Sequence, residues 1–307
     1  MVVVYPLQEG VTMNQKKLAQ YELTGSIHTL SVKSTGMPID IQEEVKDCIE
    51  SSSRSTKKDV VTTTTKINPN KLMGDVFSYS EFLPAYETIL AGAGILDPEV
   101  MRADFRLDNY DPAHYLKYAK LNKYLISALA VTYKVQNVYR TVNLFTQKQL
   151  SIAIKNRDFE AENYDKHAES NGTDIAQSRL EMRSKRMNDN DIQKEFTEKW
   201  FARWDKAIKN LKAVQAKYNE ELTKLYLEGK DAYPVRFRSL TDFLIQYQEC
   251  IFCTAQMIEL LKRLGVENPE GKAKYHKRKY GIEYFSQADV KRAVKEIKRA
   301  TTEFFES

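Results

Sequence analysis

Two short segments of this chain alternate between charged and apolar residues, and no other feature constrains its fold more. The first is "RADFRLD", residues 102–108, and the second is "SRLEMRSKR", residues 178–186. Successive side chains of a β-strand point to opposite faces, so each segment is predicted to form a strand with one charged and one apolar face. Such strands are typical of an antiparallel sheet that packs one face on a core.

Other strands are predicted from β-branched composition and turn signals. Residues 25–34 and 59–68 alternate and are rich in such residues, and the polar residues 51–59 form the predicted loop between them. "NPNKL", which follows the second of these strands, is a predicted turn. Three more short strands are expected at residues 136–145, 149–155 and 159–164.

Helices are predicted between the strands and after them. One covers residues 80–94, and another begins where Asp111 caps it and Pro112 occupies its first turn. The strands and helices show no regular βαβ alternation, and no Gly-rich phosphate loop is present. The predicted fold class is therefore α+β, with a largely antiparallel sheet flanked by helices and an all-helical C-terminal region.

The change of pattern near residue 190 predicts two domains, 1–190 and 191–307. Apolar residues recur at helical spacing after residue 191, and the two tryptophans, Trp200 and Trp204, belong to this stripe. We interpret them as packing core rather than as a platform on which bases stack. A second helix is expected from Ser239 to Gly265, and a third begins at Ser286.

Composition excludes several classes of protein. Hydrophobic residues make up 42% of the 307 residues and charged residues 29%, which excludes a disordered tail. No apolar run approaches the roughly 20 residues that a membrane span needs. Residues 1–10 lack a basic region and a cleavage site, so no signal peptide is expected. The net charge of +5 permits a polyanionic partner without demanding one.

The three cysteines form no disulfide framework, which favours a reducing compartment and a cytoplasmic protein. Cys250 and Cys253 form a Cys-x-x-Cys, but it lies in a helical apolar pattern without a second pair or a nearby histidine. We interpret these two residues as a core-facing pair rather than as a zinc or redox site.

Carboxylates of the two alternating segments are candidate metal ligands. Asp104 and Asp108 share a face but lie about 13 Å apart along a regular strand, so they cannot bind one ion together. If the two segments are neighbouring strands, Asp104 and Glu181 begin an all-oxygen site for Mg²⁺ or Mn²⁺. The flanking arginines would then contact phosphate oxygens, and these are Arg102, Arg106, Arg179 and Arg183.

The alternative for both segments needs no function. An edge strand whose acids pair with neighbouring arginines explains residues 102–108, and a strand with a polar outer face explains residues 178–186.

A tyrosine and a cluster of basic residues are the remaining candidates. Tyr164 lies in "ENYDK", and Lys166, two residues on, would share its face of a strand and assist at a phosphate. A phenol has an ordinary pKa of about 10, so it needs a base or a polarised phosphate to attack at neutral pH.

The basic cluster is either a site that binds the DNA backbone or a solvated loop. It contains Lys272, Lys274, Lys277, Arg278 and Lys279.

Taken in order, three segments resemble a known family: "TTTTKINPNKL" (62–72), "MRADFRLDNYD" (101–111), and "ENYDKHAES" (162–170) continuing into "SRLEMRSKR". The chain resembles the rolling-circle replication initiators of small bacterial plasmids and filamentous-type phages, and related relaxases, over roughly residues 60 to 187. The resemblance implies that Tyr164 nicks DNA, that Asp104 and Glu181 bind Mg²⁺ or Mn²⁺, and that Lys166 assists at the phosphate.

The same resemblance implies a reaction and partners. The tyrosine attacks a phosphodiester of an unpaired strand, forms a 5′-phosphotyrosyl intermediate and leaves a 3′ hydroxyl for a polymerase. The implied partner is origin DNA, as a single-stranded or cruciform nick site with adjacent duplex. A host helicase and a second copy of the chain are further candidate partners.

The chain also departs from the family. Lys66 stands where the plasmid initiators have a glutamate ligand, and the His-hydrophobic-His motif of related nucleases is absent. His28 is a candidate lone ligand, with a structural histidine as the alternative. These departures leave a second hypothesis, a non-catalytic DNA-binding protein on the same scaffold. A third is a helical interaction protein whose sheet is only structural.

Overall fold

The computed structural model describes residues 23–35, 41–57, 59–74, 78–187, 190–232, 234 and 236–307. The N-terminal residues 1–10, where the sequence indicates no signal peptide, lie outside this described part. Within it, no helix is long and apolar enough to cross a membrane.

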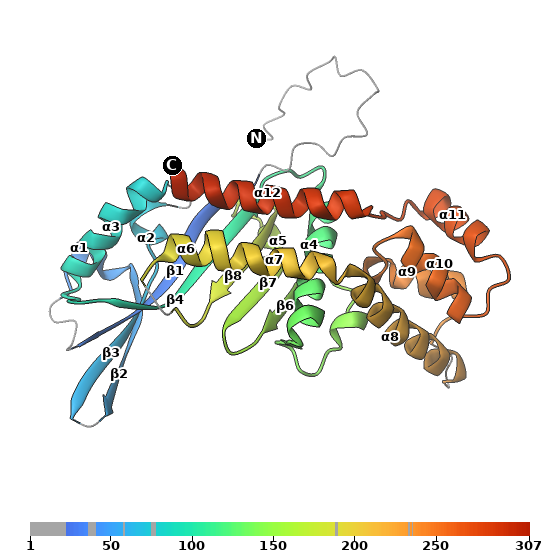
Figure 1. Cartoon of the computed structure of the whole chain (residues 1–307), viewed down its shortest axis with the longest axis horizontal. Coiled ribbons are helices and arrows are strands. Elements are labelled where there is room, and N and C mark those ends of the chain that lie inside the picture. The colour runs from blue at the N-terminus through green and yellow to red at the C-terminus, as the bar shows by residue number, and fades with distance from the viewer. Residues whose placement is uncertain are drawn as a thin grey trace, which may run out of the picture.

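An eight-stranded sheet forms the centre of the protein, and its strands follow the order β2-β3-β1-β4-β8-β7-β6-β5 (Figure 1). All seven pairs of neighbours are antiparallel, which confirms the predicted α+β class. The strands are β1 (Leu23–Thr35), β2 (Ile49–Lys57), β3 (Val60–Ile67), β4 (Glu99–Asn109), β5 (Gln136–Asn137), β6 (Ile152–Lys155), β7 (Phe159–Asp165) and β8 (Ser178–Ser184).

Helices separate and follow the strands, and the region after residue 190 is helical as predicted. The α-helices before residue 190 are α1 (Glu43–Lys46), α2 (Asn70–Met73), α3 (Tyr79–Gly92), α4 (Tyr115–Tyr133) and α5 (Lys166–Glu169). Those after it are α6 (Ile192–Lys194), α7 (Trp200–Lys209), α8 (Leu211–Asp231), α9 (Leu240–Gln246), α10 (Thr254–Arg263), α11 (Pro269–Tyr280) and α12 (Gln287–Glu306).

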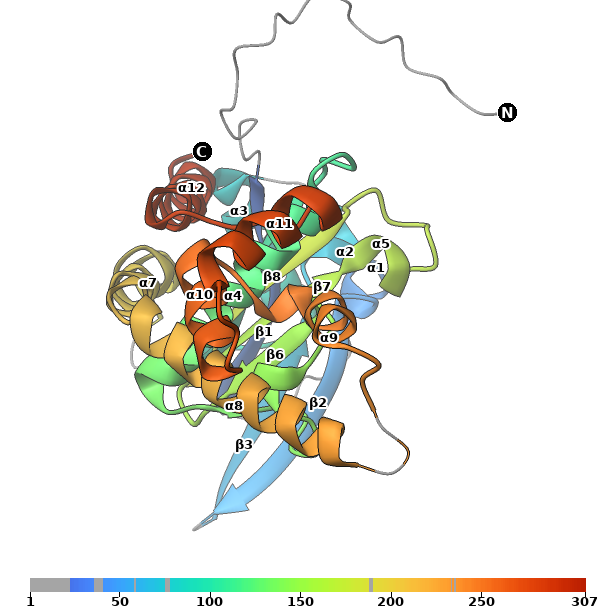
Figure 2. The ribbon, with the colours of Figure 1, turned by 90° about the vertical axis from the view of Figure 1, so that its right-hand side faces the viewer.

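One face of the sheet is covered by long helices. In Figure 2, α7 and α12 lie on one side of the strands, and α2 and α5 lie on the other. Phe105 of β4 points to the helical side, where its ring lies 5.2 Å from that of Phe196 and 5.3 Å from that of Phe304. The apolar residues of the alternating segments therefore face this core, and their charged residues face away from it.

A glycine permits the close approach of α12 to the sheet. A β-carbon added at Gly25 of β1 would lie 2.7 Å from the Phe105 ring and 3.1 Å from the backbone oxygen of Ala300. Only a residue without a side chain fits between β1 and α12 at this point.

The helices after residue 190 do not all lie beyond the sheet. Trp200 and Trp204 are fully buried, as a packing core predicts, and α7 and α12 pack along the sheet and α4. Helices α8 to α11 extend past its end (Figure 1). The division into domains at residue 190 stays a prediction.

Two predicted segments have a different structure. The polar residues 51–59 are mostly strand β2 rather than a loop, because they pair with β3 along its length. β2 lies at the edge of the sheet with residues 50–57 exposed, so it carries none of the apolar alternation that marks a half-buried strand. The expected strand at residues 136–145 is only two residues long, and a turn and a 3₁₀ segment follow it.

Helix boundaries also differ from the prediction at two places. The helix expected from Ser239 to Gly265 is broken around the Cys-x-x-Cys. The Gln256 side chain accepts a hydrogen bond from the Phe252 backbone at 2.8 Å and donates one to the Cys250 carbonyl at 2.9 Å. Cys250 is buried in the core, whereas the Cys253 thiol caps α10.

The start of α4 also differs from the prediction, because Asp111 does not cap this helix. Its side chain instead accepts a hydrogen bond of 2.8 Å from the backbone N–H of Ala113, in the turn before α4.

Candidate active site on the polar face of the sheet

The charged residues of β4 and β8 lie opposite one another on the face of the sheet that α7 and α12 do not cover. In the β4–β8 register, Asp104 pairs with Arg183, Arg106 with Glu181, and Asp108 with Arg179. Asp104 and Glu181 are thus on neighbouring strands and on one face, as the alternation predicts. β4 is an interior strand between β1 and β8, so the edge-strand interpretation of residues 102–108 is wrong.

Buried ion pairs neutralise much of this face. Arg179 donates two hydrogen bonds to Asp108, at 2.6 and 2.9 Å, and both side chains are almost fully buried. Arg102 holds Asp104 in the same two-bonded way, at 2.7 Å for each bond. Arg106 is buried and donates to Ser26 at 2.6 Å. Arg106 and Arg179 thus hold the strands together and are not exposed for DNA.

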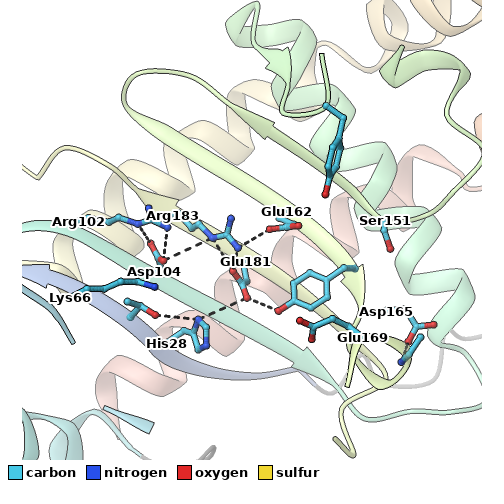
Figure 3. A pocket seen from close by; sticks show the side chains of 14 residues that line it. His28, Lys66, Arg102, Asp104, Ser151, Glu162, Asp165, Glu169, Glu181 and Arg183 are labelled. Atoms are coloured by element: carbon cyan, nitrogen blue, oxygen red, sulfur yellow. Dashed lines mark hydrogen bonds and ion pairs between the residues drawn. The ribbon is translucent and has the colours of Figure 1, made fainter. Parts of the chain in front are cut away.

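A pocket of about 780 Å³ opens beside these pairs. Figure 3 shows Arg102, Asp104, Arg183 and Glu181 along one wall, with His28 and Lys66 next to them. Most lining residues come from strands β1, β3, β4, β7 and β8, including Glu162 and Tyr164 of β7; others come from α5 and from segments between strands, such as Tyr139. The pocket therefore collects acidic, basic and phenolic groups from segments far apart in the chain.

Tyr164 makes the contact in this pocket with the most direct chemical consequence. Its hydroxyl donates a hydrogen bond of 2.7 Å to Glu181 Oε1. Burial and the adjacent Glu181 carboxylate raise the pKa of Tyr164 well above its ordinary value, while Arg179 opposes that rise. The phenol is accordingly protonated at neutral pH and held against the group that can accept its proton.

Glu181 remains ionised despite its burial. Burial by itself would raise the pKa of Glu181, but Arg183, His28 and Tyr164 together outweigh it and lower that pKa. Arg183 supplies the largest of these opposing effects, and its Nε donates to Glu181 Oε2 at 2.9 Å. For Asp104, burial prevails over the arginines and raises the pKa of the carboxyl group.

His28 reaches the pocket through an irregularity in β1. The β1–β4 register shifts between Ile27 and Thr29, so His28 is the extra residue of a β-bulge. Its Nδ1 lies 4.0 Å from Glu181 Oε1. Burial lowers the pKa of His28 to about 4, so the ring is neutral at pH 7. Bulges often re-aim side chains next to active sites, and regular alternation gives no sign of this one.

Lys166 does not lie where the sequence predicts. β7 ends at Asp165, whose side chain caps the following turn by accepting from the Ala168 backbone at 2.8 Å. Lys166 is therefore the first residue of α5 rather than a strand residue, and it does not continue the alternation from Tyr164. Its ammonium group pairs with Glu169 at 2.6 Å.

Lys66 lines the pocket and pairs with a residue that the sequence did not single out. Its partner is Glu50, which also accepts a hydrogen bond from Asn68 at 2.9 Å. Glu50 sits at a register shift between Ile49 and Ser51, immediately before the stretch predicted as polar loop. The neighbouring strand thus supplies a carboxylate next to Lys66, although position 66 itself does not carry the glutamate that the resemblance leads one to expect.

The residues near Glu181 include the donor types that Mg²⁺ or Mn²⁺ prefers, namely the Asp104 and Glu181 carboxylates and the neutral His28 ring. Both oxygens of Asp104, however, accept from Arg102, and those of Glu181 are taken by Tyr164 and Arg183. Arg183 Nε also lies 4.0 Å from Asp104.

In this arrangement the residues do not fit a divalent ion. Among the described residues, no three or more Asp, Glu, His or Cys side chains form a group that could hold a metal. The positive charge between Asp104 and Glu181 is the guanidinium of Arg183, and the expected metal site stays a prediction.

The basic cluster at residues 272–279 forms helix α11, which rules out the solvated-loop interpretation. Lys274, Lys277, Arg278 and Lys279 are exposed, and Lys272 is half-buried. Lys279 donates to the Tyr275 hydroxyl at 2.7 Å and lies over the Tyr280 ring, 5.4 Å from its centroid. This helix lies at the other end of the molecule from β2 and β3 (Figure 1).

Comparisons with known proteins yield one weak structural match. No family model and no curated protein matches the chain. Among solved structures, the rolling circle replication initiator protein from Geobacillus stearothermophilus aligns over 67% of this chain and 85% of that chain. The identity is 8% and the TM-score 0.28. So low a TM-score carries no argument about function, which has to come from the side chains of this chain.

Proposed function

We propose that this protein nicks and rejoins a DNA strand through attack of Tyr164 on a backbone phosphate. The observation that carries the proposal is the 2.7 Å hydrogen bond from the Tyr164 hydroxyl to Glu181, inside a pocket bordered by Arg102 and Arg183. A nucleophile within hydrogen-bonding distance of a base, next to groups that bind phosphate, is what covalent phosphoryl transfer requires.

In the proposed reaction, Glu181 accepts the phenolic proton and the phenolate oxygen attacks phosphorus. The bond from phosphorus to the 3′ oxygen breaks, and the 3′ oxygen leaves with the bonding electrons and takes up a proton. Lys66, an ammonium group at the pocket, is a donor for that proton. The product is a 5′-phosphotyrosyl ester, and attack by a 3′ hydroxyl on this ester reverses the step and rejoins the strand.

Binding of DNA would itself activate the base. At rest, Arg183 lowers the pKa of Glu181, which makes Glu181 a weak base, and Arg102 is engaged by Asp104. A phosphate that takes hydrogen bonds from these two guanidinium groups draws their charge away from the carboxylates. Glu181 then becomes more basic while the same arginines stabilise charge on the attacked phosphate.

A second candidate function is DNA binding without catalysis. The observation that favours it is the resting state of the pocket, where arginines neutralise the carboxylates and burial raises the pKa of Tyr164. Such a protein would mark or control an origin on the same scaffold. Mg²⁺ or Mn²⁺ enters either proposal only as a condition to be varied.

A covalent-adduct assay tests the proposal. Purified protein is incubated with supercoiled DNA and with labelled random single-stranded oligonucleotides, in Mn²⁺, in Mg²⁺ and in chelator, and is then run on denaturing gels. Tyr139→Phe is a matched control for Tyr164→Phe, because Tyr139 lines the same pocket but is half exposed.

A denaturation-resistant band that is lost in Tyr164→Phe and kept in Tyr139→Phe supports the nicking function. A band that survives both changes keeps the reaction class and moves the nucleophile to another residue. If no band forms under any metal condition while DNA binding persists, the non-catalytic function replaces the first. If DNA binding is also absent, the result favours the third hypothesis, a helical interaction protein whose sheet is only structural.

A further inference from the structure

The β2–β3 ribbon, residues 50–57 and 60–65, is the edge of the sheet to which the proposed reaction assigns no task; of these residues only Thr63 and Thr65 are buried. Figure 1 shows these strands extending away from the helices. Every residue from 50 to 57 is exposed, so both faces of β2 meet solvent. The tight turn between the strands includes Asp59, whose φ of 62° lies in the left-handed region.

The surface of the ribbon is basic and rich in hydroxyl groups. Its charged residues beyond Glu50 are Arg54 and Lys57, and serines and threonines occupy most other positions. Within the described part of the chain, neither Arg54 nor Lys57 makes an ion pair. Unpaired cations together with hydroxyl donors are the groups with which proteins contact phosphate and sugar.

The base of the ribbon borders the candidate active site. Lys66 of β3 lines the pocket and is tied to Glu50 of β2. From Lys66 to Asp59 the strand runs for about 23 Å at ~3.3 Å per residue. One strand of a DNA molecule that reaches Tyr164 would therefore carry its adjoining duplex past the ribbon.

We propose that the ribbon binds the backbone of the duplex next to the nicked strand through its exposed edge strand, β2. This inference rests on the proposed function for the identity of the partner as DNA. β1 pairs with β3 from Thr62 to Ile67, so the free edge of the ribbon is β2, whose exposed Arg54 and Lys57 can contact backbone phosphates. At ~3.4 Å per base pair, 23 Å corresponds to about seven base pairs on one side of the nick.

A second copy of this chain fits the same edge less well. Antiparallel pairing of β2 with its own copy brings the Arg54 and Lys57 of both copies onto one short ladder. Like charges that face each other across strands are unfavourable, and basic side chains on an edge strand oppose such pairing. The charge of the ribbon therefore complements a polyanion.

The test uses the full chain with Arg54→Gln and Lys57→Gln together, since both side chains are exposed and their loss leaves the core intact. Lys224→Gln with Lys230→Gln on α8 is the matched control, with two exposed lysines removed elsewhere. The probes are a stem–loop DNA with a duplex of about 12 base pairs and a random single-stranded arm, and the same arm without duplex.

For the ribbon variant, we expect binding to the stem–loop to weaken and the slope of log K against log salt to become shallower by about 2. Binding to the isolated arm and adduct formation with it stay unchanged. The control variant retains the wild-type slope.

Equal stem–loop affinity and equal slope in the ribbon variant and wild type overturn the proposal. So does sedimentation showing a wild-type dimer that the ribbon variant makes tighter, because the ribbon then pairs with a second copy and the loss of its like charges strengthens that pairing. Failure of the nicking function appears separately, as the absence of a Tyr164 adduct, and leaves the stem–loop measurement valid.

Discussion

The polar face of the sheet and helix α11 are both rich in basic residues, but they use them in opposite ways. On the sheet, Arg106 and Arg179 are about 1% and 2% exposed and are engaged by buried partners. On α11, Lys274, Lys277 and Arg278 project into solvent. The same residue types thus form an internal framework in one region and an accessible surface in the other.

This difference separates residues that shape the site from residues that are accessible to the proposed DNA partner. Removing one partner of a buried ion pair leaves a charge without compensation, which costs about 3–5 kcal/mol. An exposed lysine carries no such penalty and keeps its charge available for phosphate. Of the arginines predicted to bind DNA, Arg102 and Arg183 remain candidates because they line the pocket.

The largest effect is expected at the buried pair. Asp108→Asn should lower the free energy of unfolding by about 3–5 kcal/mol, because the buried Arg179 loses the carboxylate that accepts two hydrogen bonds from it and keeps only the more distant Asp174. Urea denaturation measures this cost. Asp205→Asn, which removes an exposed partner of Lys298, should cost no more than about 1 kcal/mol. Equal costs for the two variants would show that the polar face is not a buried framework.

The next effect concerns pH and His28. Burial lowers the pKa of His28 from 6.5 to about 4, so between these values the unfolded chain binds a proton that the folded chain does not. The free energy of unfolding should therefore fall by about 1–3 kcal/mol as pH falls from 6.5 to 4. In His28→Gln this part of the fall should disappear in urea denaturation at each pH, whereas His114→Gln, at an exposed histidine, should keep it. Parallel profiles for wild type and His28→Gln would contradict the burial of a neutral ring.

A smaller effect is expected for metal binding. Arg183→Gln removes the guanidinium between Asp104 and Glu181, so Mn²⁺ affinity should rise about tenfold, or roughly 1.4 kcal/mol. Electron paramagnetic resonance of free Mn²⁺ measures it without relying on activity. Lys66→Gln removes a pocket cation that is paired with Glu50 instead, and it should change affinity less than about twofold. If wild type already binds Mn²⁺ as tightly as Arg183→Gln, the guanidinium does not occupy the metal position.

The smallest effect on stability is expected on α11. Lys274→Gln with Arg278→Gln should leave the free energy of unfolding within about 0.5 kcal/mol of wild type. If α11 contacts phosphates, the salt slope of DNA binding should become shallower by about 2. An unchanged slope would leave α11 a solvated basic helix and confine DNA binding to the sheet region.

Alternation along residues 102–108 and 178–186 was enough to predict which side chains share a face and that Asp104 and Glu181 lie on it. It could not reveal that β1 lies between β3 and β4, because long-range pairing is not encoded in the period of either strand. Local exceptions were also hidden. The His28 bulge and the turn that redirects Lys166 each depend on one residue of register.

The edge strand was missed for a different physical reason. Residues 50–57 bury almost nothing, so their pattern resembles that of a loop, and only hydrogen bonding to β3 makes them a strand. With that strand, Glu50 was missed as the partner of Lys66. The capped starts of α3 and α12, in contrast, follow local rules: Ser78 with Glu81 and Ser286 with Asp289 each form a capping box.

The contact of α12 with β1 at Gly25 also sets the order in which the protein can be completed during synthesis. About 275 residues separate Gly25 from Ala300, and at 5–20 residues per second a ribosome needs roughly 15–55 s to add them. During that interval the apolar side of β1 and the Phe105 ring await the helix that covers them. The nascent chain therefore exposes apolar surface on β1 and at Phe105 for most of its translation, and we expect chaperones to bind at this surface.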